Sequence, residues 1–349
     1  MVSISLKEEI DTVSKAKNEI QLEESLSKAR GITERKFGKK ILFYAPSFMY
    51  YKTNYYRSSP GDFPTISVTG RECPLKCRHC EGKVLESMYP ASTGEELFAE
   101  CIKLKQSGAS GCLISGGCLP DGTVPLGRFI DPIGRVKREL HLTVFVHTGI
   151  TDLETARQLR KAGVDAALID ILGSDDTIKE ICNLNAKVKD YENSLKALNQ
   201  SRMAFVPHII VGLHYGKLVG ELNALEMVSR HNPSALVVIA FMPIRGTKME
   251  NVEPPAPLDI AKILTAARLM FPSTPLALGC MRPKGRHRTR TDILAIKAGV
   301  NAIAFPSEEG VGFAKHQGYQ IEFSSFCCAR VYSDAFSKIS GMVLKKEEI

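Results

Sequence analysis

Short, nearly continuous hydrophobic runs recur along the chain from residue 63 onward, and each is separated from the next by a longer amphipathic stretch. Each run has the length of a strand, as expected for parallel strands that are buried on both faces. The eight runs are Thr65–Thr69, Cys112–Ser115, Leu142–His147, Ala166–Leu172, Met203–Val211, Leu236–Ile244, Leu276–Cys280 and Ala302–Pro306. This alternation predicts an α/β protein with a (β/α)8 barrel of the TIM type.

The stretches between the runs have the periodicity of helices, for example Glu95–Gln106, Asp152–Lys161 and Asp259–Met270. Thr151 and Glu154 have the spacing of a capping box, which predicts where the second of these helices begins.

Three parts of the chain differ in their pattern. Residues 5–37 are highly charged with sparse apolar positions, which predicts surface helices. We therefore expect a helical extension over residues 1–40, a barrel over residues 41–310, and a tail over residues 311–349 that closes over the barrel.

Composition limits the class of protein. The 349 residues, 44% of them hydrophobic, suffice for one large α/β barrel or two smaller domains. No apolar stretch approaches the roughly 20 residues that span a bilayer, and the first residues lack the pattern of a secretory signal. A cytoplasmic location is expected. The ten cysteines then favour metal binding or catalysis over a disulfide framework.

The formal net charge is +8, which favours an acidic partner through long-range attraction. A carrier protein fits this charge as well as a nucleic acid does, and no nucleic-acid-binding motif is present. A basic surface without any binding role is the plain alternative.

The strongest chemical signal is the triplet Cys73, Cys77 and Cys80, spaced C-x-x-x-C-x-x-C directly after the first predicted strand. Three thiolates can hold three irons of a 4Fe–4S cluster and leave the fourth iron open for a ligand. A structural zinc site normally has four ligands in two close pairs, and no second pair follows nearby. The spacing therefore favours a cluster over zinc.

A triplet on the loop after the first strand resembles the radical S-adenosylmethionine (SAM) superfamily. The resemblance implies a 4Fe–4S cluster that binds and reduces SAM, with an electron supplied by a low-potential donor. It also places Gly116 and Gly117, at the end of the second strand, along the methionine part of SAM. Cys118 stands where many relatives have a glutamate, and His79 stands where they usually have an aromatic residue.

Two further segments carry the resemblance. Asp170, at the end of the fourth strand, lies where the family binds the ribose hydroxyls, although an aspartate that only begins a turn is the alternative. The segment through Met242 and Pro243 resembles the part of biotin synthases that borders the adenine. These matches imply that the barrel follows the biotin-synthase pattern.

The seventh strand ends in Cys280 and is followed by several arginines, including Arg282 and Arg286. We expect Arg282 and Arg286 to bind a carboxylate, a phosphate or an acidic partner. A solvated start of the next helix is the alternative reading.

Four cysteines outside the triplet are candidates for a second Fe–S cluster, if the tail folds across the barrel. They are Cys118, Cys280, Cys327 and Cys328. Adjacent cysteines rarely both bind one cluster, so Cys328 is the expected bystander. The remaining cysteines, Cys101, Cys112 and Cys182, are expected to be core thiols, and His147 and His208 more often serve as hydrogen-bonded fillers than as ligands.

The cysteine pattern resembles a biotin-synthase-like family that includes one component of a two-protein lipoyl synthase. The resemblance implies sulfur insertion into an octanoyl chain on an acidic carrier protein, together with a second radical SAM protein. Two alternatives stay open: a radical SAM enzyme that acts on a small molecule of another cofactor pathway, and a metal-containing nucleic-acid-binding protein.

Overall fold

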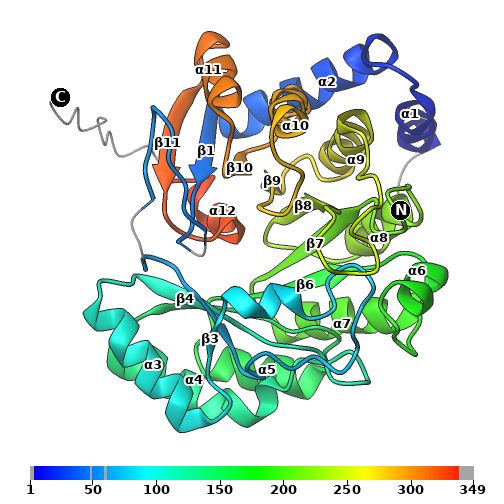
Figure 1. The fold of residues 1–349 in the computed structure, drawn as a ribbon. Coiled ribbons are helices and arrows are strands. Elements are labelled where there is room, and N and C mark those ends of the chain that lie inside the picture. Colours follow the sequence, from blue (N-terminus) through cyan, green and yellow to red (C-terminus); the bar gives the residue numbers. More distant parts are fainter. Residues whose placement is uncertain (1–3, 48, 59–60, 338–349) are drawn as a thin grey trace, which may run out of the picture.

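The computed structural model describes residues 4–47, 49–58 and 61–337. Its centre is a curved sheet of eleven parallel strands (Figure 1). In chain order the strands are β1 (Lys40–Tyr44), β2 (Thr65–Ser67), β3 (Tyr89–Pro90), β4 (Gly111–Ser115), β5 (Thr143–His147), β6 (Ala166–Ile171), β7 (Phe205–Val211), β8 (Leu236–Ala240), β9 (Leu276–Leu278), β10 (Ala302–Ala304) and β11 (Gln320–Ser324).

All eight predicted runs form strands, and the α/β fold of the barrel type is confirmed. The spatial order is β11-β1-β10-β9-β8-β7-β6-β5-β4-β2-β3, so β3 and β11 are the two edges of the sheet. In the part of the chain that the structure describes, these edges do not pair with each other, and the barrel stays open.

Helices cover the outer face of the sheet (Figure 1). They are α1 (Ile4–Lys15), α2 (Glu19–Phe37), α3 (Gly94–Gln106), α4 (Ile130–Arg135), α5 (Leu153–Lys161), α6 (Asp175–Glu180), α7 (Val188–Ser201), α8 (Glu221–Ser229), α9 (Pro257–Met270), α10 (Arg286–Lys297) and α11 (Glu308–His316), while α12 (Val331–Asp334) lies elsewhere. Helix α5 is capped by Asp152, which accepts from the Thr155 N–H, so the predicted capping box at Thr151 is wrong by one residue. Within residues 4–47, 49–58 and 61–337, no helix combines the length and the hydrophobicity that crossing a membrane requires.

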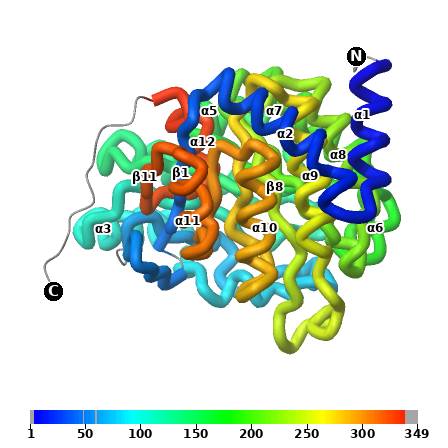
Figure 2. Tube along the Cα trace, turned by 90° about the horizontal axis from the view of Figure 1, so that it is seen from above, coloured from blue at the N-terminus to red at the C-terminus, as the bar shows by residue number. Residues whose placement is uncertain are grey.

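The N-terminal helices pack on the outside of the barrel. Both α1 and α2 contact α9, and α2 also contacts α10 (Figure 2). The Thr33 hydroxyl donates a 2.5 Å hydrogen bond to the carbonyl of Gly299 at this junction. Strand β1 then enters the sheet between β10 and β11. The predicted extension also includes residues 1–3, which lie outside the described residues.

Two hydrophobic cores result, one on each face of the sheet. The outer core fills the space between strands and helices, with side chains such as Ile66, Val144 and Ile169. The inner core fills the concave face with side chains such as Phe145, Leu168 and Val206. Alternation along each strand sends successive side chains to opposite faces, so most of the strands contribute to both cores.

The inner core is completed by Cys327–Ala335, which we call the inner segment. Cys328, Ala329 and Val331 of this segment are buried in the inner core, and α12 lies within the curve of the sheet (Figure 1). Lys40 and Tyr44 of β1 hold α12 by hydrogen bonds to the backbone carbonyl and the carboxylate of Asp334. The expected tail therefore packs inside the barrel instead of closing over it, while residues 338–349 lie outside the described residues.

Candidate functional site

The cysteine triplet lies on the loop that follows β2. Cys73, Cys77 and Cys80 are 9%, 8% and 7% exposed, so the loop holds three thiols just beneath the surface. The N–H groups of Cys80 and Glu81 both donate to the carbonyl of Cys77, which winds the loop around that residue. A hydrogen bond to the sulfur of Cys77, together with burial, raises the pKa of Cys80 to about 12. A bound metal would reverse this shift, because it stabilises the thiolate.

The segment after α6 clamps this loop. The Asn183 amide donates to the carbonyls of Leu75 and Lys76 at 3.1 and 2.8 Å. The Arg78 N–H donates to the carbonyl of Ile181 at 2.7 Å. The Cys77 thiol donates to the carbonyl of Cys182 at 3.3 Å. Cys182 is buried, as expected, but it lies against the triplet instead of far from it.

The paired glycines at the end of β4 approach the same loop from the other side. A Cβ on Gly117 would lie 2.1 Å from the carbonyl oxygen of Glu72 and 2.7 Å from the Cα of Cys73, so only glycine fits. The Gly117 N–H donates to the Thr69 hydroxyl at 2.7 Å, and that hydroxyl donates to the carbonyl of Glu72. Gly116 and Gly117 thus lie beside the cysteine loop, where the sequence placed the methionine part of SAM.

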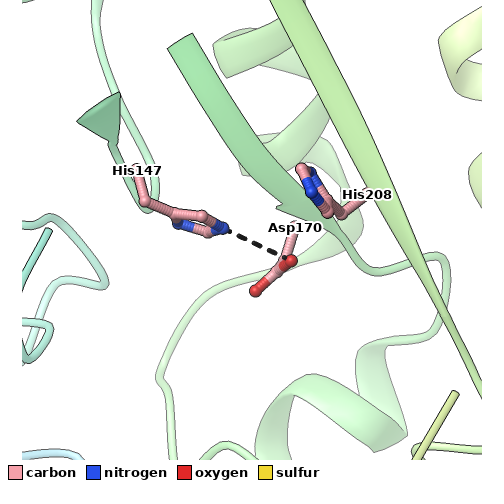
Figure 3. A group of neighbouring side chains, drawn as sticks. All are labelled: His147, Asp170 and His208. Carbon is pink, nitrogen blue, oxygen red and sulfur yellow. Dashed lines mark ion pairs between the residues drawn. The ribbon is translucent and has the colours of Figure 1, made fainter. Parts of the chain in front are cut away.

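Three polar side chains from adjacent strands meet inside the barrel, two of them at or near the C-terminal ends of their strands and His208 in the middle of β7. His147 of β5, Asp170 of β6 and His208 of β7 have donor atoms that all lie within 4.8 Å of one another (Figure 3). The distance from His147 Nε2 to Asp170 Oδ1 is 3.5 Å, and these side chains are 23% and 39% exposed within the open barrel. We call His147, Asp170 and His208 the polar triad.

Mutual electrostatics set the charges of the polar triad. Burial works to raise the pKa of Asp170, but His147 and the other nearby histidines outweigh it and lower that pKa. Burial opposes the charged form of His147, and Asp170 overcomes this and raises the pKa of His147. Burial lowers the pKa of His208 to about 4. At neutral pH, Asp170 is therefore ionised and His208 is neutral.

The other candidate SAM-binding residues lie at the same end of the barrel. Met242 and Pro243 follow β8 directly and are half-buried. The turn after them reaches the cysteine loop, since a Cβ on Gly246 would lie 2.4 Å from the Lys83 ammonium nitrogen.

Arg282 corrects an expectation from the sequence. Its side chain is fully buried and forms an ion pair with Asp292 at 2.8 Å. The remaining guanidinium hydrogens donate to the carbonyls of Gly279, Ala304 and Phe305. No donor is left for a substrate or partner, so Arg282 supports the turn after β9. Arg286 is exposed at the start of α10.

The four candidate cysteines of a second cluster fall into two places. Cys118 packs against the outer core, which also contains the triplet. Burial, together with the nearby Cys73 thiol and Asp170, raises the pKa of Cys118 to about 12. This placement differs from the expectation that Cys118 joins the others. The remaining three belong to the inner core and its margin: Cys280, Cys327 and Cys328.

The inner three thiols interact with one another. The Cys328 thiol donates to the sulfur of Cys327, which lowers the pKa of Cys327 and raises that of Cys328. The backbone N–H of Ala329 and the charge of His147 lower the pKa of Cys327 further. Cys327 is thus the more ligand-like thiol of the pair, and it lies on the side of the polar triad.

The thiols fit a cluster better than a single zinc ion. Three thiolates on one tetrahedral zinc lie about 3.8 Å apart, given a Zn–S distance of about 2.3 Å. Among the described residues, three potential ligand atoms lie within 4.8 Å of one another only in the polar triad. The sulfur atoms of the cysteine triplet are therefore spread more widely than this. A cubane cluster spans such a spread, because each thiolate binds a different iron.

Comparison with known proteins defines the class. A family model described as the radical SAM superfamily matches residues 67–216, from β2 to just beyond β7. This range contains the triplet, the paired glycines and the polar triad. The fold, the cysteine loop and the family match together identify a radical SAM domain.

Within that class, the chain is a distant relative of the biotin synthases. It is 22% identical over 220 residues to the biotin synthase of Leptospira interrogans, covering 60% of each chain. It is 26% identical over 252 residues to that of Chromohalobacter salexigens, covering 69% of this chain and 65% of that one. The chain thus matches about two thirds or less of the length of these relatives.

Solved structures share the fold. Methylornithine synthase superposes with a TM-score of 0.62 at 18% identity, over 90% of this chain and 93% of the other. The FeFe-hydrogenase maturase HydG from Carboxydothermus hydrogenoformans superposes with a TM-score of 0.65 at 16% identity, over 96% and 78%. At these identities the likeness concerns the fold alone.

Two residues beside the cysteine loop, Asn183 and Cys182, were not predicted to lie there from the sequence. Asn183 and Cys182 lie far from the triplet in sequence, and only the packing of the loop after α6 brings them to it. The polar triad had a partial signal, because His147 and Asp170 lie near the ends of predicted strands and parallel strands end at one edge, while His208 lies within the next predicted strand.

Proposed function

We propose that the protein is a radical SAM enzyme in which Cys73, Cys77 and Cys80 hold a 4Fe–4S cluster. The single observation that supports this most is the junction of the cysteine loop with Gly117, where a missing Cβ brings the backbone of β4 against Cys73. When bound, the cluster and SAM supply one-electron cleavage of a sulfonium C–S bond and a carbon radical that abstracts hydrogen.

In this proposal, the chain's own residues bind SAM and exclude water. Gly116 and Gly117 border the methionine part, the ionised Asp170 accepts from the ribose hydroxyls, and Met242 and Pro243 border the adenine. The open side of the barrel admits the substrate, and the inner core closes the other side.

For the reaction, we propose sulfur insertion into an octanoyl chain on an acidic carrier protein, as one half of a lipoyl synthase. Cys280 and Cys327 in the barrel support it, since they offer ligands for a second Fe–S cluster near the polar triad. The charge of +8 suits an acidic carrier. A cytoplasmic location, a low-potential electron donor and a second radical SAM protein belong to the same proposal.

The test is an anaerobic reconstitution with iron and sulfide. We expect dithionite and SAM to yield 5′-deoxyadenosine with wild type and none with a Cys73/Cys77/Cys80 triple alanine variant. About four irons left in that variant would support the second cluster, and their loss on Cys280→Ala and Cys327→Ala would assign it. A colourless protein that leaves SAM intact would overturn the proposal.

A small-molecule substrate is the second candidate, and the polar triad favours it. Two imidazoles and a carboxylate in the barrel suit a substrate with polar groups better than a plain hydrocarbon chain. Incubation with free dethiobiotin beside octanoylated carrier protein separates the two candidates by which compound gains sulfur.

A further inference from the structure

The polar triad has the composition and geometry of a metal site that is separate from the cysteine loop. His147, Asp170 and His208 project from three adjacent strands, β5, β6 and β7 (Figure 3). Two histidines and one carboxylate on a common face bind divalent transition metals while leaving positions open for other ligands.

The distance between His147 and Asp170 suits ligands of one ion. Ligands at about 2.0–2.2 Å from a zinc-like ion lie roughly 3–3.5 Å apart when they are neighbours around it. The distance of 3.5 Å from His147 Nε2 to Asp170 Oδ1 lies at the upper end of this range. It exceeds the usual range for a hydrogen bond, so the two groups do not satisfy each other fully.

The tautomer of His208 is also that of a ligand. Its Nδ1 lies 3.1 Å from the carbonyl oxygen of Val206. A carbonyl can only accept, so Nδ1 carries the proton and Nε2 bears the free lone pair. A hydrogen bond from the far nitrogen to a backbone carbonyl is the arrangement that orients most metal-binding histidines.

The backbone makes the triad rigid. Asp170 and His208 are direct neighbours in the register of β6 and β7, and His147 pairs with Leu168, two residues before Asp170. Side chains held on adjacent strands lose little freedom when an ion binds, in contrast to ligands on loops.

We propose that His147, Asp170 and His208 bind one divalent transition-metal ion, of the class of Fe²⁺, Co²⁺ or Zn²⁺, inside the barrel. Because Asp170 is also the proposed ribose ligand, the ion and SAM exclude each other; this second statement rests on the proposed function. A metal ion at this site would then prevent SAM from binding and being cleaved until SAM displaces the ion.

The test of binding uses Co²⁺ alone as the probe, added to the Cys73/Cys77/Cys80 triple alanine chain under anaerobic conditions. We expect one Co²⁺ per chain with the weak visible bands of nitrogen and oxygen ligands. His208→Ala and Asp170→Asn should each weaken binding at least about 100-fold, beyond the 10–100-fold typical of lost second-shell contacts. The exposed His316→Ala variant is the matched control and should bind as its parent does.

Intense thiolate absorption, or equal binding by the parent and the His208→Ala chain, would overturn the site. Asp170→Asn preserves shape, and its melting curve without metal shows whether a lost signal reflects misfolding. If Co²⁺ raises the melting temperature of the parent and the His316→Ala control but not that of the His208→Ala and Asp170→Asn variants, the result supports the site.

The test of exclusion uses the iron-loaded wild type. Saturating Co²⁺ should suppress 5′-deoxyadenosine formation at low SAM, and excess SAM should restore it. If Co²⁺ binds but 5′-deoxyadenosine formation is not suppressed, the proposal that Asp170 serves both the ion and SAM is wrong, while the ion site is supported. If the protein cleaves SAM but binds no Co²⁺, the proposed ion site is wrong, while the proposed function is supported.

Discussion

Single residues decide how the cysteine loop is held. Lys76 and Glu81 adopt left-handed backbone conformations, with φ of 45° and 47°, on either side of Cys77 and Cys80. Such conformations are unfavourable for residues with a Cβ, so contacts from elsewhere must maintain them. Asn183 supplies two of these contacts and has a left-handed φ of 52° itself.

We expect Asn183→Ala to loosen the cysteine loop. It removes two hydrogen bonds of about 1 kcal/mol each and places alanine in a conformation that asparagine tolerates better. The two bonds together are about 2 kcal/mol, and about 1.4 kcal/mol corresponds to a tenfold change, so a chelator should remove iron roughly 30-fold faster.

The measurement is the decay of cluster absorption after a chelator is added, with Asn199→Ala on α7 as control. A broadened electron paramagnetic resonance signal of the reduced cluster in Asn183→Ala would distinguish altered positioning from general instability. Identical decay in both variants would contradict the clamp.

Glu221 at the start of α8 is a second residue with a calculable effect. It is buried, and its Oε1 accepts from the Gly212 N–H, while Oε2 has no hydrogen-bond partner among the described residues. Burial raises its pKa. The folded state therefore disfavours the charged carboxylate, and stability falls as pH rises above the unfolded pKa of about 4.3 until it passes the folded pKa.

We expect Glu221→Gln to stabilise the protein at pH 7, since the amide resembles the neutral acid. The difference in unfolding free energy from wild type should be small near pH 4 and grow toward neutral pH. Urea titrations across this range measure it, and Glu226→Gln on the exposed face of α8 is the control. A constant difference at all pH values would argue against burial as the cause.

At the scale of elements, most strands could be predicted because they are buried on both faces and therefore read as continuous apolar runs. Strands β1, β3 and β11 were missed, and β3 has only two exposed residues, Tyr89–Pro90. β11 is an edge strand with the partly polar sequence Gln320–Ser324, and β1 follows the charged helices directly, outside the alternating pattern that begins at residue 63. No sequence pattern predicted that the inner segment packs within the barrel, because the path of this segment depends on where β11 ends.

The inner segment is attached to β1 by Tyr44. This tyrosine is fully buried, and its hydroxyl donates to the Asp334 carboxylate at 2.8 Å. We expect Tyr44→Phe to lower the unfolding free energy by about 1.5–3 kcal/mol, the usual contribution of a hydrogen bond to a charged group.

Hydrogen exchange measures the local effect. Amide protection should fall across Cys327–Ala335 in Tyr44→Phe, while the exposed Tyr50→Phe variant should behave as wild type. Unchanged protection in the inner segment would mean that Asp334 does not anchor it.

At the scale of the whole molecule, the two ends of the described chain depend on each other. Strand β1 pairs with β10 on one side and β11 on the other, so residue 42 faces residues 302 and 322. The N-terminal helices then close the outer face over α9 and α10.

We expect a chain that ends at Gly318 to aggregate. It lacks β11 and the inner segment, which leaves β1 as an unpaired edge and the inner core open to water. Size-exclusion chromatography beside a chain that ends at Ser337 measures this, and a monomeric, cooperatively melting shorter chain would contradict it.

The position of β1 also sets the order of events during synthesis. Residues 40–44 leave the ribosome early, yet both of their partner strands are made from residues 302–324. Such distant pairing slows folding and leaves the nascent strand exposed for most of translation. The barrel interior, including Cys327, therefore takes shape only after the chain has been made as far as the inner segment.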